Sequence, residues 1–356
     1  MTKIDDVARL AGVSTATVSR ALRGLPTVSA ATRRRVLAAA EQLQYAVSPS
    51  ASRLAGGKTG TVAVVVPRIT RWFFGTVVEA VEDYLHQNGY DLLLYNLGGR
   101  EQTRQRVLRP ASLHKRVDAI ILVATPLRPA DLTALTKLAL PGVTISSGSG
   151  VPGWPRVRID DVAAARTATR HLLDLGHTRI AHISGDPDDE LAFTTHLDRR
   201  RGYQEALRAA GLRPDPSLDV ESQFTVDGGT RATAELLARG EPPTAIFAAC
   251  DEMAMGAMTA LRDAGLRVPQ DVSVIGIDDH DLAGVLGLST IAQPAAEQGL
   301  LAARMLLDPL GGRVAGPYAG LVPAPRGAEA DDGSPASVIL PTRLVVREST
   351  APPRAN

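Results

Sequence analysis

The sequence contains one cysteine and no long uncharged apolar run. Cys250 alone excludes an internal disulfide and any zinc site built on cysteines, and the seven histidines show no metal-ligand spacing. No window approaches the roughly 18 apolar residues of a membrane-spanning helix. Residues 1–12 are too polar for the apolar part of a secretory signal. We therefore expect a cytoplasmic protein that has no membrane contact, metal or cofactor.

The signatures of common enzyme sites are missing or misplaced. Residues 148–153 satisfy G-x-G-x-x-G, but Pro152 and Pro155 forbid the helix whose first amides would meet a pyrophosphate. Asp278 and Asp279 are adjacent on a predicted strand end, so their side chains diverge rather than form an acid and base pair. The sequence has no Walker motif, G-x-S-x-G or H-E-x-x-H. We therefore expect no enzymatic activity.

The first 46 residues predict a small all-α head. Apolar residues recur at helical spacing on both sides of Gly12, which can end a first helix in the left-handed conformation. Ser14 can then cap a second helix by accepting a hydrogen bond from its first free amides. A third helix is predicted for residues 30–43. Three such helices close one small core, and the first two form a helix-turn-helix.

The outer face of the second helix carries short polar groups and one long cation. Residues 1–58 hold nine Lys and Arg against three acids, whereas the whole chain has a net charge of only +1. An ordinary helical hairpin does not explain this excess, but a head that binds DNA does. We expect Thr15, Ala16 and Arg20 to read bases in the major groove. The residues expected to meet mainly phosphates are Ser14, Thr17, Ser19 and Arg33.

The motif D-V-A-x-x-A-G-V-S-x-A-T-V-S-R-x-L, followed by V-S-x-x-T-R-x-R-V, extends from Asp6 to Val36. It resembles the lactose-repressor (LacI/GalR) family of bacterial transcription regulators. Arg23 stands where that family usually has Asn, and it adds a cation that could contact DNA. The resemblance implies that residues 47–60 are a hinge helix that orders on operator DNA and inserts Leu54 into the minor groove. Pro49 is shifted from the family position, and a flexible tether without DNA contact is the alternative.

From residue 61 onward, short apolar strands alternate with amphipathic helices. The first series has predicted strands at 62–66, 91–95, 119–123 and 143–146, with helices near 75–87, 101–115 and 129–138. The second has strands at 180–184, 220–222, 245–249 and 272–277, with helices near 162–175, 199–210, 228–238 and 253–264. Buried strands separated by helices indicate parallel sheets, and two series indicate two α/β lobes.

The chain is expected to cross between these lobes more than once. Residues 290–294 return it to the first lobe for a helix at 295–307, and residues 338–346 supply a terminal strand to the second. Such crossings make a hinged, two-lobed clamshell like that of periplasmic binding proteins, with a cleft at the carboxyl ends of the strands. The predicted parts are a head at 1–46, a hinge at 47–60, a first lobe at 61–158 plus 293–316, a second lobe at 159–292 plus 337–350, and a disordered loop at 314–336.

The resemblance also implies a site for a small effector in the cleft. Its second-lobe contacts fall on Arg199, Cys250 and Asp278, and Cys250 replaces a family Asn that could both donate and accept a hydrogen bond. From the first lobe, Trp72 either stacks on a sugar face or packs in the core. The remaining candidate effector residues are Arg68, Phe73 and, at the lobe crossover, Asp160.

Together these features predict a repressor of carbohydrate-utilisation genes. We expect a homodimer that binds a near-palindromic operator, because one head reads too few base pairs for specificity. A small sugar held between Arg199 and Asp278, which suit vicinal hydroxyls, would close the lobes and release the DNA. The alternatives are a sugar-binding protein without regulatory DNA binding and a corepressor-type regulator that responds to a nucleobase.

Overall fold

The computed structural model describes residues 3–22, 25–45, 58–146, 150–186, 194–307 and 337–354. Arg23, Leu54 and the predicted loop at 314–336 lie outside these ranges, as does most of the predicted hinge. The chain divides into two compact units. The first is Met1–Gly60 with Lys115–Asp118, and the second is Thr61–His114 with Ala119–Asn356.

The head contains helices α1 (Ile4–Ala11), α2 (Thr15–Leu22) and α3 (Ala30–Gln42). Gly12 ends α1 with φ 63°, a conformation that glycine adopts at little cost. The Ser14 Oγ accepts a hydrogen bond from the Thr17 amide at 3.2 Å and caps α2. Val7, Val18 and Val36 are fully buried and join the three helices in one core. The predicted helix-turn-helix is confirmed.

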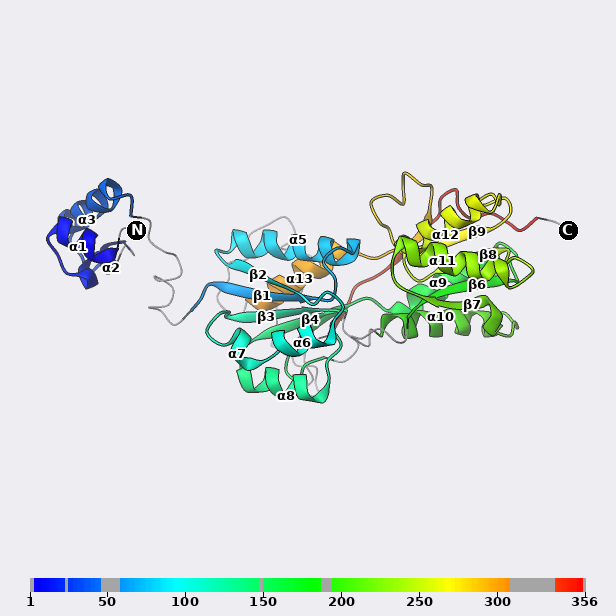
Figure 1. Ribbon diagram of the computed structural model, residues 1–356, viewed down its shortest axis with the longest axis horizontal. Coiled ribbons are helices and arrows are strands. Elements are labelled where there is room, and N and C mark those ends of the chain that lie inside the picture. The colour runs from blue at the N-terminus through cyan, green and yellow to red at the C-terminus, as the bar shows by residue number, and fades with distance from the viewer. Residues whose placement is uncertain are drawn as a thin grey trace. The chain divides into compact units, whose positions relative to one another are not determined.

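The first lobe is a six-stranded sheet in the order β11-β5-β4-β3-β1-β2, and every neighbouring pair is parallel. Its strands are β1 (Thr61–Val66), β2 (Asp91–Asn96), β3 (Ala119–Val123), β4 (Gly142–Ile145), β5 (Arg156–Arg158) and β11 (Ser337–Ile339). Its helices are α5 (Trp72–Gln87), α6 (Glu101–Val107), α7 (Pro110–Leu113), α8 (Pro129–Leu138) and α13 (Ala295–Leu307). Figure 1 shows α5 and α8 on opposite sides of this sheet.

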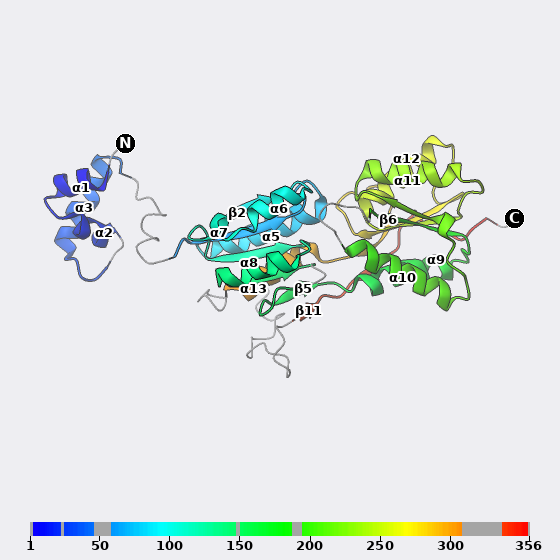
Figure 2. The ribbon, with the colours of Figure 1, turned by 60° about the horizontal axis from the view of Figure 1, so that its bottom comes forward.

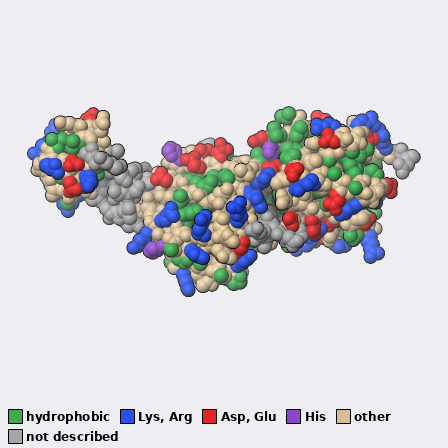
Figure 3. All heavy atoms as spheres, in the orientation of Figure 1, with side chains coloured by type: hydrophobic (Ala, Val, Ile, Leu, Met, Phe, Trp, Pro, Cys, Tyr) green, Lys and Arg blue, Asp and Glu red, His purple; other side chains and the backbone are tan. Residues whose placement is uncertain are grey.

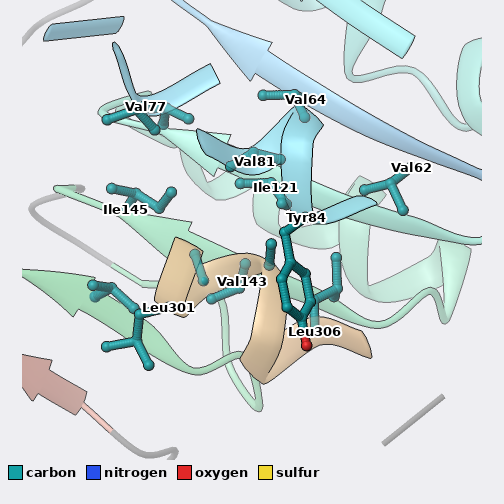
Figure 4. Close-up of a cluster of buried hydrophobic side chains, with 14 of the residues drawn as sticks. Val62, Val64, Val77, Val81, Tyr84, Ile121, Val143, Ile145, Leu301 and Leu306 are labelled. Atoms are coloured by element: carbon teal, nitrogen blue, oxygen red, sulfur yellow. The ribbon is translucent and has the colours of Figure 1, made fainter. Parts of the chain in front are cut away.

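The core of this lobe lies where α5 and α13 pack on the sheet. Val64 and Ile121 from the strands meet Val81 and Tyr84 from α5, with Leu306 from α13 closing the cluster (Figure 4). Short continuous apolar strands are buried on both faces, which is the pattern that predicted a parallel sheet.

The second lobe repeats this plan with the order β12-β10-β9-β8-β6-β7. Its strands are β6 (Ile180–Gly185), β7 (Asp219–Ser222), β8 (Ala245–Ala248), β9 (Ser273–Asp278), β10 (Ser289–Ala292) and β12 (Arg343–Val345). Its helices are α9 (Asp161–Asp174), α10 (Thr195–Ala209), α11 (Val226–Ala238) and α12 (Asp251–Asp263), with the short 3-10 helix η1 (Pro216–Leu218) before β7. Figure 2 shows α11 and α12 on one side of the sheet and α9 and α10 on the other.

Several predicted elements differ from the structure, among them α10, which begins at Thr195 rather than at 199. The strand expected at 338–346 is two strands: β11 pairs with β5 in the first sheet, and β12 pairs antiparallel with β10 in the second. Pro341, between them, has no amide to donate to a ladder. The single helix expected at 101–115 is broken into α6 and α7 before Pro110, for the same reason. The helix expected from 75 begins at Trp72 instead.

Candidate functional site

The exposed face of α2 carries the side chains predicted to read DNA. Thr15, Ala16 and Arg20 are exposed, whereas Val18 and Ala21 on the opposite face are buried. The hydroxyls of Ser14 and Thr17 lie 3.0 Å apart, so part of their hydrogen-bonding capacity already serves the cap. Ser19 is half-buried. The outer face of α2 therefore carries short polar side chains and one exposed arginine, Arg20.

Arg33 differs from the other predicted phosphate contacts. Its Nη2 donates to the Leu25 carbonyl oxygen at 2.6 Å, which ties α3 to the segment that follows α2. The side chain thus already has a structural role inside the head.

A cavity of about 170 Å³ lies at the carboxyl ends of the strands in both lobes. β1 lies between β2 and β3, and β6 lies between β7 and β8, so each sheet reverses its strand order at these points. Loops at such a switch point open a crevice for ligands. Pro67 and Arg68, which follow β1, and Asp186, which follows β6, line the cavity. Among the predicted effector residues, those that line it are Arg68, Trp72, Phe73, Arg199, Cys250 and Asp278.

Arg199, from α10, is the central cation of the cavity and is almost fully buried. Its Nε donates to Asp161 Oδ1 at 2.9 Å, and its Nη1 donates to the Ala249 carbonyl oxygen. Burial opposes the charge, but Asp161 and Asp278 outweigh it and raise the Arg199 pKa above its usual range. Asp161 is thus the ion-pair partner of Arg199, and Nη2 has no hydrogen bond to any described residue.

Asp278 ends β9 and is the central acid of the cavity. It is buried, and its Oδ1 accepts a hydrogen bond from Gln293 Nε2 at 2.6 Å. Asp251, fully buried at the start of α12, accepts hydrogen bonds from Thr290 Oγ1 at 2.7 Å and the His280 amide at 2.9 Å. Burial and the Asp251 charge raise the pKa of Asp278 against the opposing effect of Arg199. A carboxyl that keeps its proton can both donate and accept.

Backbone strain gathers at the same place. Ala124 and Ser146 directly follow β3 and β4, and Asp278 ends β9; these three cavity residues have φ values of 41°, 48° and 146°, and none is glycine. Residues in this region cost on the order of 1 kcal/mol or more and persist where the surroundings enforce them, often at binding sites. The strand ends are thus held in positions that aim side chains into the cavity.

Two predicted residues have other roles in this structure. Asp160 does not line the cavity, because its side chain caps α9 by accepting a hydrogen bond from the Ala163 amide at 2.9 Å. The next residue, Asp161, occupies the expected place. Burial raises the pKa of the Cys250 thiol well above its usual range, so this side chain lines the cavity as a small uncharged group.

Contacts across the cavity mouth join the lobes. Glu252, on α12, accepts hydrogen bonds from Arg71 Nη1 at 3.0 Å and from the Trp72 amide at 3.2 Å. The Trp72 ring lies 5.3 Å from the His280 ring, centroid to centroid. The indole Nε1 is buried without a hydrogen-bond partner among the described residues. Trp72 therefore packs at the mouth and also retains an unused donor.

Sequence reasoning missed several other lining residues. Gln223, Phe224 and Thr225 follow β7, and Gln293 follows β10. The rule that ligands bind beyond the carboxyl ends of parallel strands could have found the first three. Gln293 lies at a lobe crossover, and no local pattern marks it. Among the described residues, no cluster of His, Cys, Asp and Glu could hold a metal ion, and no helix is long and apolar enough to cross a membrane.

Comparisons with known proteins agree with both parts of this geometry. Residues 3–48 match the family model described as bacterial regulatory proteins, lacI family. Residues 169–350 match the model of a periplasmic binding protein-like domain. The catabolite control protein A of Priestia megaterium is 36% identical over 305 residues, which cover 85% of this chain and 91% of that protein. The HTH-type transcriptional repressor CytR of Escherichia coli K12 is 35% identical over 314 residues, which cover 87% of this chain and 90% of that protein.

Two solved structures cover nearly the whole chain. The lac repressor dimer bound to operator and the anti-inducer ONPF has a TM-score of 0.80 at 27% identity, covering 98% of this chain and 99% of that one. The complex of the transcriptional regulator CelR with cellobiose has a TM-score of 0.68 at 32% identity, covering 98% and 100%.

A helix-turn-helix head joined to a two-lobed α/β ligand-binding fold defines a DNA-binding transcriptional regulator. The chain belongs to the LacI family of bacterial regulatory proteins.

Proposed function

We propose that this regulator is a cytoplasmic, non-enzymatic repressor that releases its operator when a small neutral carbohydrate binds in the cavity. The observation that carries the proposal is the donor and acceptor set around one small space. Arg199 Nη2 and Trp72 Nε1 are donors without described partners, and Asp278 is an acid whose raised pKa favours a proton. Sugar hydroxyls both donate and accept, which suits this set.

The size of the cavity restricts the effector. An apolar cavity of roughly 150 Å³ admits benzene, and about 170 Å³ is available here. One six-membered ring fits that space. Trp72, Phe73 and Phe74 supply an apolar wall for the face of the ring. The related CelR structure contains cellobiose, which supports a carbohydrate as the class of ligand.

The proposed response follows from the contacts at the mouth. An effector that binds both lobes favours one arrangement of Arg71 and Trp72 against Glu252 over others, and it shifts that equilibrium by its difference in affinity. Coupling of about 1 to 3 kcal/mol is typical and changes operator affinity about 5- to 150-fold. The protein acts as a dimer, as does the related lac repressor, so two heads bind a near-palindrome.

A thermal-shift screen of monosaccharides, disaccharides and nucleobases tests the ligand class. Operator binding is then measured by fluorescence anisotropy with and without each hit. We expect a monosaccharide to raise the melting temperature and weaken operator binding. A nucleobase that strengthens binding would instead support the corepressor alternative. Asp278→Ala removes both hydrogen-bonding atoms and should keep operator affinity while losing the response, whereas the exposed Asp263→Ala should keep both.

A further inference from the structure

The segment between β2 and β3 concentrates positive charge on the first lobe. Residues 100–116 contain six Lys and Arg and a single acid, Glu101. Figure 3 shows these cation types spread over the face where Figure 1 places α6 and α7. Residues 59–356 carry a net negative charge, because residues 1–58 exceed the total of +1. The cations therefore form a local positive surface on an otherwise acidic part of the chain.

Most of these cations do not stabilise the lobe. Arg104 is the exception: it is buried and pairs with Glu101 at 2.8 Å and Asp131 at 2.6 Å. Glu101 also pairs with Arg128 at 2.8 Å, so the one local acid is fully engaged. The cations that are exposed and form no ion pair with a described residue are Arg100, Arg106, Arg109 and Lys115. Like charges on one surface repel, and a partner of opposite charge would remove that cost.

The end of this segment is close in sequence to Asp118, which hydrogen-bonds the residues that precede β1. Asp118 accepts hydrogen bonds from the Thr59 amide at 2.7 Å, the Thr59 hydroxyl at 3.0 Å and the Gly60 amide at 2.7 Å. Lys115 lies three residues before Asp118. The chain that leads to the head therefore leaves the lobe at residues that hydrogen-bond Asp118, three positions from Lys115. Residues 100–116 contain no Trp, Tyr or Phe that could stack on bases.

We propose that Arg106, Arg109 and Lys115 form an auxiliary phosphate-binding surface that holds DNA flanking the operator without reading its sequence. This surface adds affinity by neutralising phosphates and releasing counterions. It acts in addition to base reading by α2, so longer duplexes bind more tightly than the bare operator.

The test uses the full-length protein and an operator selected by it from a random duplex library. Anisotropy titrations compare that operator alone with the same operator carrying about 15 random base pairs on each side. We expect the longer duplex to bind at least threefold more tightly at low salt. The triple variant R106Q/R109Q/K115Q should lose that advantage and keep the affinity for the bare operator. Its slope of log affinity against log salt on the long duplex should fall by about 2 to 3.

A matched control removes three exposed arginines from the second lobe: R170Q/R208Q/R262Q. It makes the same change in net charge and should keep the length advantage. The proposal is overturned if the first triple variant keeps the advantage, or if both triple variants lose it equally. It is also overturned if wild type shows no length dependence, which would leave an acidic protein as the partner to seek. Retained binding to the bare operator shows that the head is intact.

Discussion

At the residue scale, the adjacent acids Asp160 and Asp161 have different roles, although the sequence suggested only one of them for the effector site. Asp160 caps α9 while Asp161 holds Arg199 in the cavity. The sequence predicted Asp160 as the effector residue at this crossover, but Asp161 faces the cavity, because the position at which α9 begins decides which acid caps the helix. Arg199 lies in α10, Cys250 directly precedes α12 and Asp278 ends β9, and all three positions, taken residue by residue from the family motif, line the cavity.

The buried pair of acids predicts an unusual dependence of stability on pH. Since the pKa of Asp278 is raised by folding, the unfolded chain loses its proton first as pH rises. The stability contribution of this group is therefore full below the unfolded pKa and declines as pH rises toward the folded pKa. The side chain of the Asp278→Asn variant cannot ionise. Near pH 8, its free energy of unfolding should therefore exceed that of wild type by about 2 kcal/mol.

Chemical denaturation between about pH 4 and pH 8 measures this difference, which should shrink toward the acid end. Asp263→Asn, an exposed control, should follow wild type throughout. A less stable Asp278→Asn protein at pH 8 would mean that folding favours the ionised form of Asp278, contrary to the expected direction.

Arg20 provides a residue-scale prediction for DNA binding. It is exposed on α2, beside the equally exposed Thr15 and Ala16. Arg20→Ala should cost about 1 to 3 kcal/mol of operator affinity and relax base preference at one position in each half-site. Selection of bound sequences before and after the change measures both effects. Equal affinity and unchanged preference would remove Arg20 from the base-reading set.

At the element scale, hydrophobic periodicity predicted most helices and strands. It failed at two prolines, where a helix and a strand predicted as continuous are each broken in two. Apolar runs marked β1, β3 and β8 because these strands are buried on both faces. Apolar residues continue across Pro110 and Pro341, so the pattern alone joined α6 to α7 and β11 to β12. Which sheet a three-residue strand joins depends on long-range pairing, which no local pattern contains.

The close packing of α11 and α12 gives an element-scale prediction. A Cβ on Gly256 would lie 2.0 Å from the Val226 carbonyl oxygen and 2.6 Å from the Thr230 amide. Both atoms belong to the backbone, so the helices must separate to admit it. Gly256→Ala should lower the free energy of unfolding by about 1 to 3 kcal/mol. It should also weaken the effector response, since Thr225 and Cys250 precede these two helices and line the cavity.

Gly75→Ala is the matched control, because Gly75 lies in α5 with its nearest neighbour, the Ile69 carbonyl oxygen, at 3.8 Å. It should raise stability slightly through helix propensity. If both alanines behave alike in denaturant unfolding, helix separation does not limit the site.

At the scale of the whole molecule, dimerisation requires an apolar surface outside both lobe cores. Leu282, Val285 and Leu286 are 50%, 81% and 44% exposed in the turn after β9. The Leu286 amide donates to the Leu282 carbonyl oxygen at 3.0 Å, so this turn is helical and presents the three side chains together. Exposed apolar clusters of this kind mark protein interfaces. We expect the same cluster from a second copy to cover it, as a two-fold axis would require.

Val285→Asp should therefore weaken the dimer at least about tenfold, because it places a charge in each half of the interface. Sedimentation velocity over a concentration series measures the dissociation constant, and operator titrations should become steeper in protein concentration. Ile339→Asp replaces a residue that is 50% exposed on β11 of the first lobe and should leave the dimer unchanged. The turn also begins at His280, which contacts Trp72 and donates its amide to Asp251. A dimer contact here would thus lie directly behind the effector cavity, and Val285→Asp should reduce the effector response of whatever dimer remains at high concentration. If the weakened dimer still shows the full effector response, this interface does not take part in the response.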